Sequence, residues 1–212
     1  KKVYFENVSF DTIVDTVSEG KLTNVGAAGL SITDERLEKV DFSIPYYVAN
    51  LYVIYNVDAV SESFSKVMND GVTGVYWSSL ETTKGIGIQT GTTADFFLSD
   101  EVSEGGSLEG TKKTGYSLLD TAVADIGLNI DYVVIDELPA KKLVEGKDKL
   151  ACLPLYYEVS DEPAYDEYAI AVTKGQTELL DTINEVLESL LVADEDGVTT
   201  IQKMVNTHLG IK

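Results

Sequence analysis

The sequence predicts an α/β fold in which strands and helices alternate along the chain and pack in layers. Strand-like and helix-like segments follow one another in the order β-α-β-α-β near the start of the chain, with short connections between them. The 212 residues suit one large domain or two lobes of roughly 100 residues each. A hydrophobic content of 44% with 25% charged residues is typical of a folded globular chain.

The N-terminal elements are assigned from their periodicity. Residues 3–8 alternate as a strand does, and Ile13, Val14 and Val17 recur at helical spacing in a helix that Gly20 ends. Small residues in the next strand indicate that another part of the chain packs closely against it. The elements expected here are a strand at 3–8, a helix at 10–18, a strand at 22–30, a helix at 33–39 and a strand at 51–55.

The rest of the chain continues the alternation after a less regular stretch. Residues 61–84 fit no single element and are interpreted as a hairpin or loop. A near-continuous apolar strand at 130–135 suits a sheet that is buried on both faces. The other elements expected are a strand at 85–89, helices at 94–99 and 118–126, a helix beginning at Pro139, a strand at 168–172 and terminal helices at 178–192 and 199–208.

Composition argues against several classes of function. The chain has 16 basic and 36 acidic residues, a net charge of −20, which disfavours nucleic acid or an anionic membrane surface as a partner. No apolar run approaches the roughly 18 residues of a membrane-spanning helix. Because Cys152 and His208 are single copies, we expect no intrachain disulfide, no metal site and no histidine-based catalysis. Cys152 lies in an apolar run and is expected to be a buried thiol.

Arg36 is the only arginine of the chain, and its position favours anion binding. Thr33 is expected to cap a short helix with Asp34 and Glu35 in its first turn, where a cation is unfavourable by roughly 0.3–1 kcal/mol. A guanidinium held there beside unpaired N–H groups can bind a carboxylate through two hydrogen bonds. The alternative is a solvated side chain paired with Asp34 or Glu35 on the helix surface.

Two further places at the ends of elements are candidates for binding charged ligand groups. Residues 89–93 turn from a strand into a helix, where N–H groups and threonine hydroxyls suit an anion, although many α/β turns have this form. Asp136 stands at the carboxyl end of a parallel strand, where open α/β sheets bind ligands. Its alternative role is to cap the helix that follows.

Together these groups match a free α-amino acid. A guanidinium with a helix N-terminus can hold a carboxylate, and a carboxylate at a strand end can hold an ammonium. Because burying either ligand charge without a partner is costly, a site that closes on a zwitterion must supply both complements.

Five segments of the chain form, in order, the pattern of a known family. They are residues 29–36 (GLSITDER), 40–47 (VDFSIPYY), 88–93 (IQTGTT), 133–136 (VVID) and 168–172 (YAIAV). On these motifs the chain resembles the polar amino-acid solute-binding proteins of ABC importers. The resemblance covers nearly all of the chain and implies an α/β, two-lobed clamshell, the type II periplasmic-binding-protein fold, with two hinge strands. Lobe 1 would comprise residues 1–52 plus 167–212, and lobe 2 residues 53–166.

The resemblance also assigns ligand-binding residues. Arg36 would hold the ligand carboxylate, helped by the backbone N–H and hydroxyl of Thr92 or Thr93 from the other lobe. Asp136 would bind the ammonium, with the backbone of Ala28 and the Oγ of Ser31 as further acceptors. The remaining candidates are Phe10, which would pack on the ligand side chain, and Gly91 and Gln89 of the loop.

Two departures from the family pattern affect the expected site. Family members carry a further strand and helix, roughly 35–45 residues, ahead of the segment that matches residues 3–8, and this part is absent from the sequence. It normally supplies a core strand of lobe 1 and a ligand contact. Residues 61–84 look longer than usual.

The resemblance implies an extracytoplasmic, non-enzymatic binding protein, secreted or held as a lipoprotein, that captures a polar amino acid for an ABC permease and needs no cofactor. A sensor domain of a membrane receptor or kinase, and a dehydratase like a few proteins of this fold, are the alternatives. The chain is expected to be a monomer unless the missing N-terminal segment leaves an open sheet edge that promotes dimerisation. A further alternative is that the chain without this segment binds nothing. Gln89 and Ile135 flank the predicted site without fixed charge and favour a neutral polar amino acid.

Overall fold

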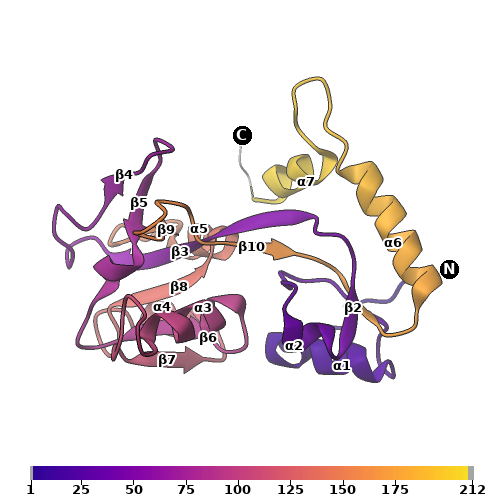
Figure 1. Ribbon diagram of the computed structural model, residues 1–212, viewed down its shortest axis with the longest axis horizontal. Helices are drawn as coiled ribbons and strands as arrows, with labels where there is room; N and C mark the ends of the chain where they lie inside the picture. Colours follow the sequence, from indigo (N-terminus) through magenta and orange to yellow (C-terminus); the bar gives the residue numbers. More distant parts are fainter. Residues whose placement is uncertain (1, 210–212) are drawn as a thin grey trace. The chain divides into compact units, whose positions relative to one another are not determined.

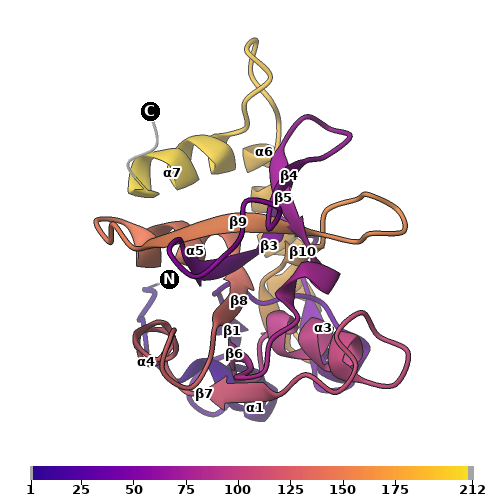
Figure 2. The same cartoon turned by 90° about the vertical axis from the view of Figure 1, so that its left-hand side faces the viewer.

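The computed structural model describes residues 2–209, apart from the side chain of Leu209. The chain forms two compact units. Unit 1 comprises Lys1–Val48 and Glu167–Lys212, and unit 2 comprises Ala49–Asp166. The chain passes from one unit to the other within two strands, β3 (Tyr47–Asn56) and β10 (Tyr165–Tyr168). Both units combine strands with helices, so the predicted α/β class is confirmed (Figures 1 and 2).

Unit 1 contains a small antiparallel sheet with the strand order β1-β11-β2. Its core is formed by Val17, Leu30, Val40 and Ala171. Gly26 lies so close to the first helix that an added Cβ would be 2.9 Å from the side chain of Val17. The strands are β1 (Val25–Gly26), β2 (Val40–Phe42) and β11 (Ala171–Thr173), and the helices are η1 (Phe10–Thr12), α1 (Ile13–Glu19), α2 (Asp34–Leu37), α6 (Thr177–Leu190) and α7 (Thr200–Leu209).

The predicted strand at residues 3–8 is wrong. Residues 2–9 have no regular secondary structure, and the side chains of Val3, Tyr4 and Phe5 are 76%, 79% and 94% exposed. An alternating sequence forms a strand only when another strand satisfies its backbone groups, and no strand of the described chain pairs with this segment. The predicted strand at 22–30 is reduced to β1 for the same reason, since only Val25 and Gly26 pair with β11.

Unit 2 is built around one mixed sheet with the strand order β4-β5-β9-β3-β8-β6-β7, and β10 also pairs with β3. Long β3 runs between β8 and β9 and is antiparallel to both, whereas β6 is parallel to β7 and β8. The other strands are β4 (Lys66–Val67), β5 (Thr73–Tyr76), β6 (Ile86–Gln89), β7 (Lys113–Tyr116), β8 (Tyr132–Asp136) and β9 (Leu150–Tyr156), and the helices are η2 (Trp77–Leu80), α3 (Thr93–Val102), α4 (Leu119–Ala124) and α5 (Glu137–Val144).

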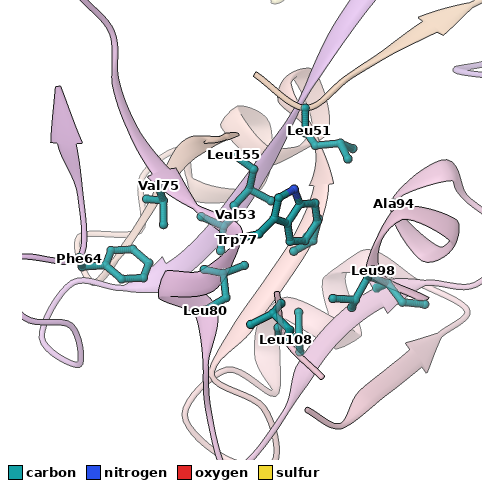
Figure 3. Packing of buried hydrophobic residues seen from close by; sticks show 14 residues of the cluster. Leu51, Val53, Phe64, Val75, Trp77, Leu80, Ala94, Leu98, Leu108 and Leu155 are labelled. Atoms are coloured by element: carbon teal, nitrogen blue, oxygen red, sulfur yellow. The ribbon is translucent and has the colours of Figure 1, made fainter. Parts of the chain in front are cut away.

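Side chains alternate between two cores on the faces of this sheet. Val53 of β3 and Val134 of β8 belong to one core cluster, while Ile54 and Val133 belong to the other. Trp77 is 1% exposed and fills the first cluster, where Figure 3 shows it among residues of β3, β9 and η2. The near-continuous apolar sequence of β8 is therefore explained by burial on both faces, as predicted.

The sequence did not predict β7 or β9. Polar residues interrupt β7, and β9 contains Pro154, which argues against a strand in the interior of a sheet. Cys152 of β9 is only partly buried, although burial is enough to raise the pKa of its thiol.

The hairpin interpretation of residues 61–84 is confirmed, because β4 and β5 form an antiparallel pair. The hydroxyl of Tyr156 donates to Asp70 Oδ2 over 2.7 Å, and that of Tyr76 donates to Asp161. These two hydrogen bonds attach the hairpin to β9 and to the loop that follows it.

We expect Trp77→Ala to lower the free energy of unfolding by about 3–5 kcal/mol, because it removes a large side chain from a closed apolar cluster. Urea unfolding followed by circular dichroism measures this loss, since Trp77 is the only tryptophan and fluorescence would be lost with it. Val67→Ala is the matched control. Its side chain is 67% exposed, so it should change stability by less than about 0.5 kcal/mol. Equal losses in the two variants would contradict the packing of Trp77.

Candidate functional site

Arg36 is held in unit 1 by a short, capped helix. Thr33 is the N-cap of α2, and its Oγ accepts a hydrogen bond from the Arg36 backbone N–H over 3.2 Å, as the sequence predicts. The guanidinium Nη1 of Arg36 donates to the carbonyl oxygen of Ser31 over 2.7 Å. The residue is only 6% exposed, so the alternative of a solvated arginine on the helix surface is wrong.

The other unit 1 candidates lie on the segment that leads into this helix or pack against the core of unit 1. Ser31 is fully buried, and its backbone forms an isolated β-bridge with Tyr168. The carbonyl oxygen of Ala28 accepts a hydrogen bond from the hydroxyl of Tyr46 over 2.9 Å. Burial raises the pKa of Tyr46, so this hydroxyl stays a donor in neutral solution. Phe10 and Ala28 both pack against the core cluster of unit 1.

In unit 2, the sheet register brings the loop at 89–93 and Asp136 to the same end of two adjacent strands. Strands β6 and β8 are parallel, and Gly87 is paired with Val133. Three residues further along each strand, Thr90 therefore lies at the level of Asp136. Asp136 is 7% exposed and occupies the N-cap position of α5, but its side chain forms no capping hydrogen bond. The capping alternative is thus correct for the position of Asp136 and wrong for its carboxylate.

Hydrogen bonds fix the loop that joins β6 to α3. Gly91 has φ +78°, a conformation that glycine adopts without strain. Thr92 is the N-cap of α3, and its hydroxyl donates to the carbonyl of Gln89 over 2.8 Å while accepting from the backbone N–H of Asp95. The proton of the Thr92 hydroxyl is therefore used within the loop. The side-chain amide of Gln89 donates to the carbonyl of Ser117 over 3.3 Å.

Two residues of this half of the site were not predicted. Asp166 accepts a hydrogen bond from the hydroxyl of Thr93, and Asp95 accepts one from the backbone N–H of Gly91 over 3.0 Å. Asp95 stands three residues after a threonine N-cap, a spacing that signals a capping box and that could have identified it. Asp166 follows Thr93 by 73 residues, so no local pattern could have paired them.

The structure thus groups the predicted residues within each unit. Unit 1 contains Phe10, Ala28, Ser31 and Arg36, and unit 2 contains Gln89, Gly91, Thr92, Thr93 and Asp136. Each group offers complementary chemistry, a buried cation in unit 1 and a buried carboxylate beside a helix N-terminus in unit 2. Their ligand-binding roles remain predictions.

Two features are absent from residues 2–209. Among these residues, no three histidine, cysteine, aspartate or glutamate side chains gather where they could hold a metal ion. None of the helices in the same range is long and apolar enough to cross a membrane.

The profile of the bacterial extracellular solute-binding proteins, family 3, matches residues 1–204. The putative ABC transporter arginine-binding protein 2 of Escherichia coli is 27% identical over 194 residues, which cover 88% of this chain and 68% of that protein.

Solved structures agree with the fold. An arginine-bound, truncated form of ArgBP from T. maritima is 26% identical with a TM-score of 0.68, over 87% of this chain and 76% of that one. Arginine-bound AbpA, an amino acid ABC transporter substrate-binding protein of Streptococcus pneumoniae, has a TM-score of 0.76 at 24% identity, over 97% and 76% of the two chains, and supports the fold.

Proposed function

The chain belongs to the bacterial extracellular solute-binding proteins, family 3, and from this premise we propose that it captures a polar amino acid outside the cytoplasm and delivers it to an ABC permease. The E. coli relative is a putative arginine-binding protein of an ABC transporter, AbpA is an amino acid ABC transporter substrate-binding protein, and the structures of ArgBP and AbpA hold arginine.

Arg36 is the observation that carries the proposal. It is the only arginine of the chain, and it is buried at the start of a helix. Burial desolvates its charge and the helix N-terminus disfavours a cation, so an exposed position would cost less free energy. Its Nη1 donates to the carbonyl oxygen of Ser31, and the N–H donors of a guanidinium form a planar fork. A ligand carboxylate is the complement to such a fork, and the N-terminus of α3 in unit 2 is a second group of the kind that suits a carboxylate.

Asp136 supplies the opposite charge for the ligand ammonium in this proposal. Its carboxylate is buried at the end of β8, at the level of the loop that would contribute N–H groups to the ligand. A buried carboxylate that binds an ammonium offsets part of the desolvation of both groups. The amino-acid class is thus favoured over a simple anion or a simple cation.

We further propose that the protein binds its ligand without converting it. Catalysis needs a titratable group matched to a proton-transfer step, and the single histidine, His208, lies on α7 and outside both groups of candidate residues. The predicted lobes, residues 1–52 plus 167–212 and residues 53–166, the monomeric state and the lipoprotein or secreted form also remain predictions.

Arginine is the first ligand to test. The prediction of a neutral amino acid rested on Gln89 and Ile135, but Ile135 is 2% exposed and belongs to a core cluster, so it supports no choice of ligand charge. The related structures hold arginine, and a net charge of −20 attracts cations.

A thermal-shift screen of the chain against the twenty amino acids tests the proposed function. A ligand at about 1,000 times its dissociation constant adds about 4 kcal/mol to the stability of the binding unit, which corresponds to a shift of roughly 8–16 °C. We expect arginine or another polar amino acid to give such a shift and to be recovered unchanged by mass spectrometry. No shift with any amino acid would contradict amino-acid capture by this chain, and a converted ligand would contradict a purely binding role.

Arg36→Ala should raise the dissociation constant of the best ligand by about tenfold or more, because it removes a charge-assisted, bidentate contact worth about 1.5–3 kcal/mol. Isothermal titration calorimetry measures the change. Lys39→Ala is the matched control, since Lys39 is a nearby exposed cation that pairs with Asp15 over 2.9 Å. If the two variants bind equally well, Arg36 does not hold the carboxylate.

Asp136→Asn should also weaken binding by about tenfold or more, since the amide keeps the size of the side chain but removes the charge opposite the ammonium. The matched control is Asp131→Asn, just before the other end of β8, where the carboxylate accepts from Thr82 and pairs with Lys84. Competition by the des-amino analogue of the ligand, which lacks the ammonium, gives a second measurement. Asp136→Asn should lose no affinity for this analogue. An equal loss of affinity for the ligand and the analogue would place the ammonium elsewhere.

A further inference from the structure

Asp95 connects both sides of the turn that precedes α3. Its carboxylate Oδ2 accepts the backbone N–H of Gly91 over 3.0 Å, and its own backbone N–H donates to the hydroxyl of Thr92. Gly91 and Thr92 are therefore held at fixed positions relative to the first turn of the helix. The side chain of Asp95 is only 14% exposed, so these contacts are shielded from water.

The placement of Asp95 has an electrostatic cost for the proposed ligand. A carboxylate in the first turn of a helix stabilises the helix, but it also places a negative charge beside the N–H groups that would attract a ligand carboxylate. Like charges at this range repel one another, and the repulsion is larger where side chains are partly buried. If no cation compensated the charge of Asp95, the loop at 89–93 would be a poor site for an anion.

Lys113 of β7 supplies the compensating charge. Its ammonium pairs with Asp95 Oδ1 and donates to the hydroxyl of Ser99 over 2.5 Å, and the side chain is 30% exposed. The same strand also supports the loop directly, since the carbonyl of Tyr116 accepts the backbone N–H of Thr90 over 3.0 Å. Strands β6 and β7 are paired along their full length (Figure 2), and α3 contacts both of them.

We propose that Lys113 and Asp95 are positioning residues that set the affinity of the loop at 89–93 for the ligand carboxylate. Asp95 fixes the geometry of the loop through Gly91 and Thr92, and Lys113 cancels the charge that this geometry requires. This inference rests on the proposed function, in which the loop binds the carboxylate of an amino acid. It assigns the two residues an indirect electrostatic role and no contact with the ligand.

Charge variants separate this electrostatic role from a structural one. Lys113→Met leaves Asp95 uncompensated and should raise the dissociation constant for L-arginine by about tenfold. Asp95→Asn keeps an oxygen acceptor for the Gly91 N–H and removes the negative charge, so it should bind no more weakly than the unchanged protein. The double variant has neither charge and should recover to within about threefold of the unchanged protein.

The opposite pattern would overturn the inference. If Lys113 and Asp95 only hold the fold together, each single variant weakens binding and the double variant is the weakest of the three. Isothermal titration calorimetry with L-arginine, or with the best ligand of the screen if arginine does not bind, distinguishes the two patterns. Melting temperatures measured without ligand verify that the variants are folded.

Lys84→Met is the matched control for the loss of a paired lysine. Lys84 pairs with Asp131 over 3.1 Å just before the start of β6, whereas the loop follows the end of that strand. This variant should bind as the unchanged protein does, and equal losses in Lys84→Met and Lys113→Met would overturn the inference. Failure of the unchanged protein to bind any amino acid would instead contradict the proposed function, so the two failures are distinguishable.

Discussion

The arrangement of unit 2 depends on the pairing of β3 with β8 on one side and β9 on the other. Five residue pairs, from Leu51–Asp136 to Tyr55–Tyr132, fix β3 against β8. A shift of one residue would exchange the two faces of a strand and move Val134 and Ile135 into the wrong cores. Because both faces of the sheet are buried, this register has no low-cost alternative. The position of Asp136 at the carboxyl end of β8 follows directly from this register.

The same register explains why the two halves of the unit 2 site lie together although they are far apart in sequence. Strand β8 is fixed by β3, and β6 is fixed by β8, so the carboxyl ends of β6 and β8 reach a common level. The loop after β6 then turns through Gly91 into α3, with its hydrogen bonds supplied by Thr92 and Asp95. Core packing therefore positions the candidate residues of unit 2, and the hydrogen bond from Thr93 to Asp166 adds a long-range polar contact.

Local chemistry made part of this structure predictable. Thr33 was predicted to cap a helix because capping depends on a few neighbouring residues, and its side chain accepts the hydrogen bond of the Arg36 backbone N–H. The apolar run before Asp136 identified a buried strand for a similar reason, since burial on both faces leaves no polar position.

The errors arose where a long-range partner decides the outcome. Residues 3–8 have the pattern of a strand and form none, because no strand within residues 2–209 lies beside them. Strand β9 contains a proline and yet pairs with β3, since tertiary pairing outweighs the local preference. The bond from Thr93 to Asp166 joins distant parts of the chain, and local spacing carries no information about it. The sequence was thus sufficient to propose the polar residues of the site, but it did not predict the long-range hydrogen bonds that hold them.

The distribution of charge assigns different tasks to the site and to the rest of the molecule. A net charge of −20 raises the local concentration of cations and speeds their arrival, and this effect weakens as salt is added. It cannot by itself hold an α-amino acid, because a zwitterion with a neutral side chain has no net charge for the field to act on.

Buried Arg36 and Asp136 act at short range, where water screens them little, and they would recognise the two groups that all α-amino acids share. A cationic side chain would add long-range attraction to this shared recognition. The arginine bound to related proteins is therefore compatible with recognition of these shared groups, and selectivity would come from the residues that meet the ligand side chain.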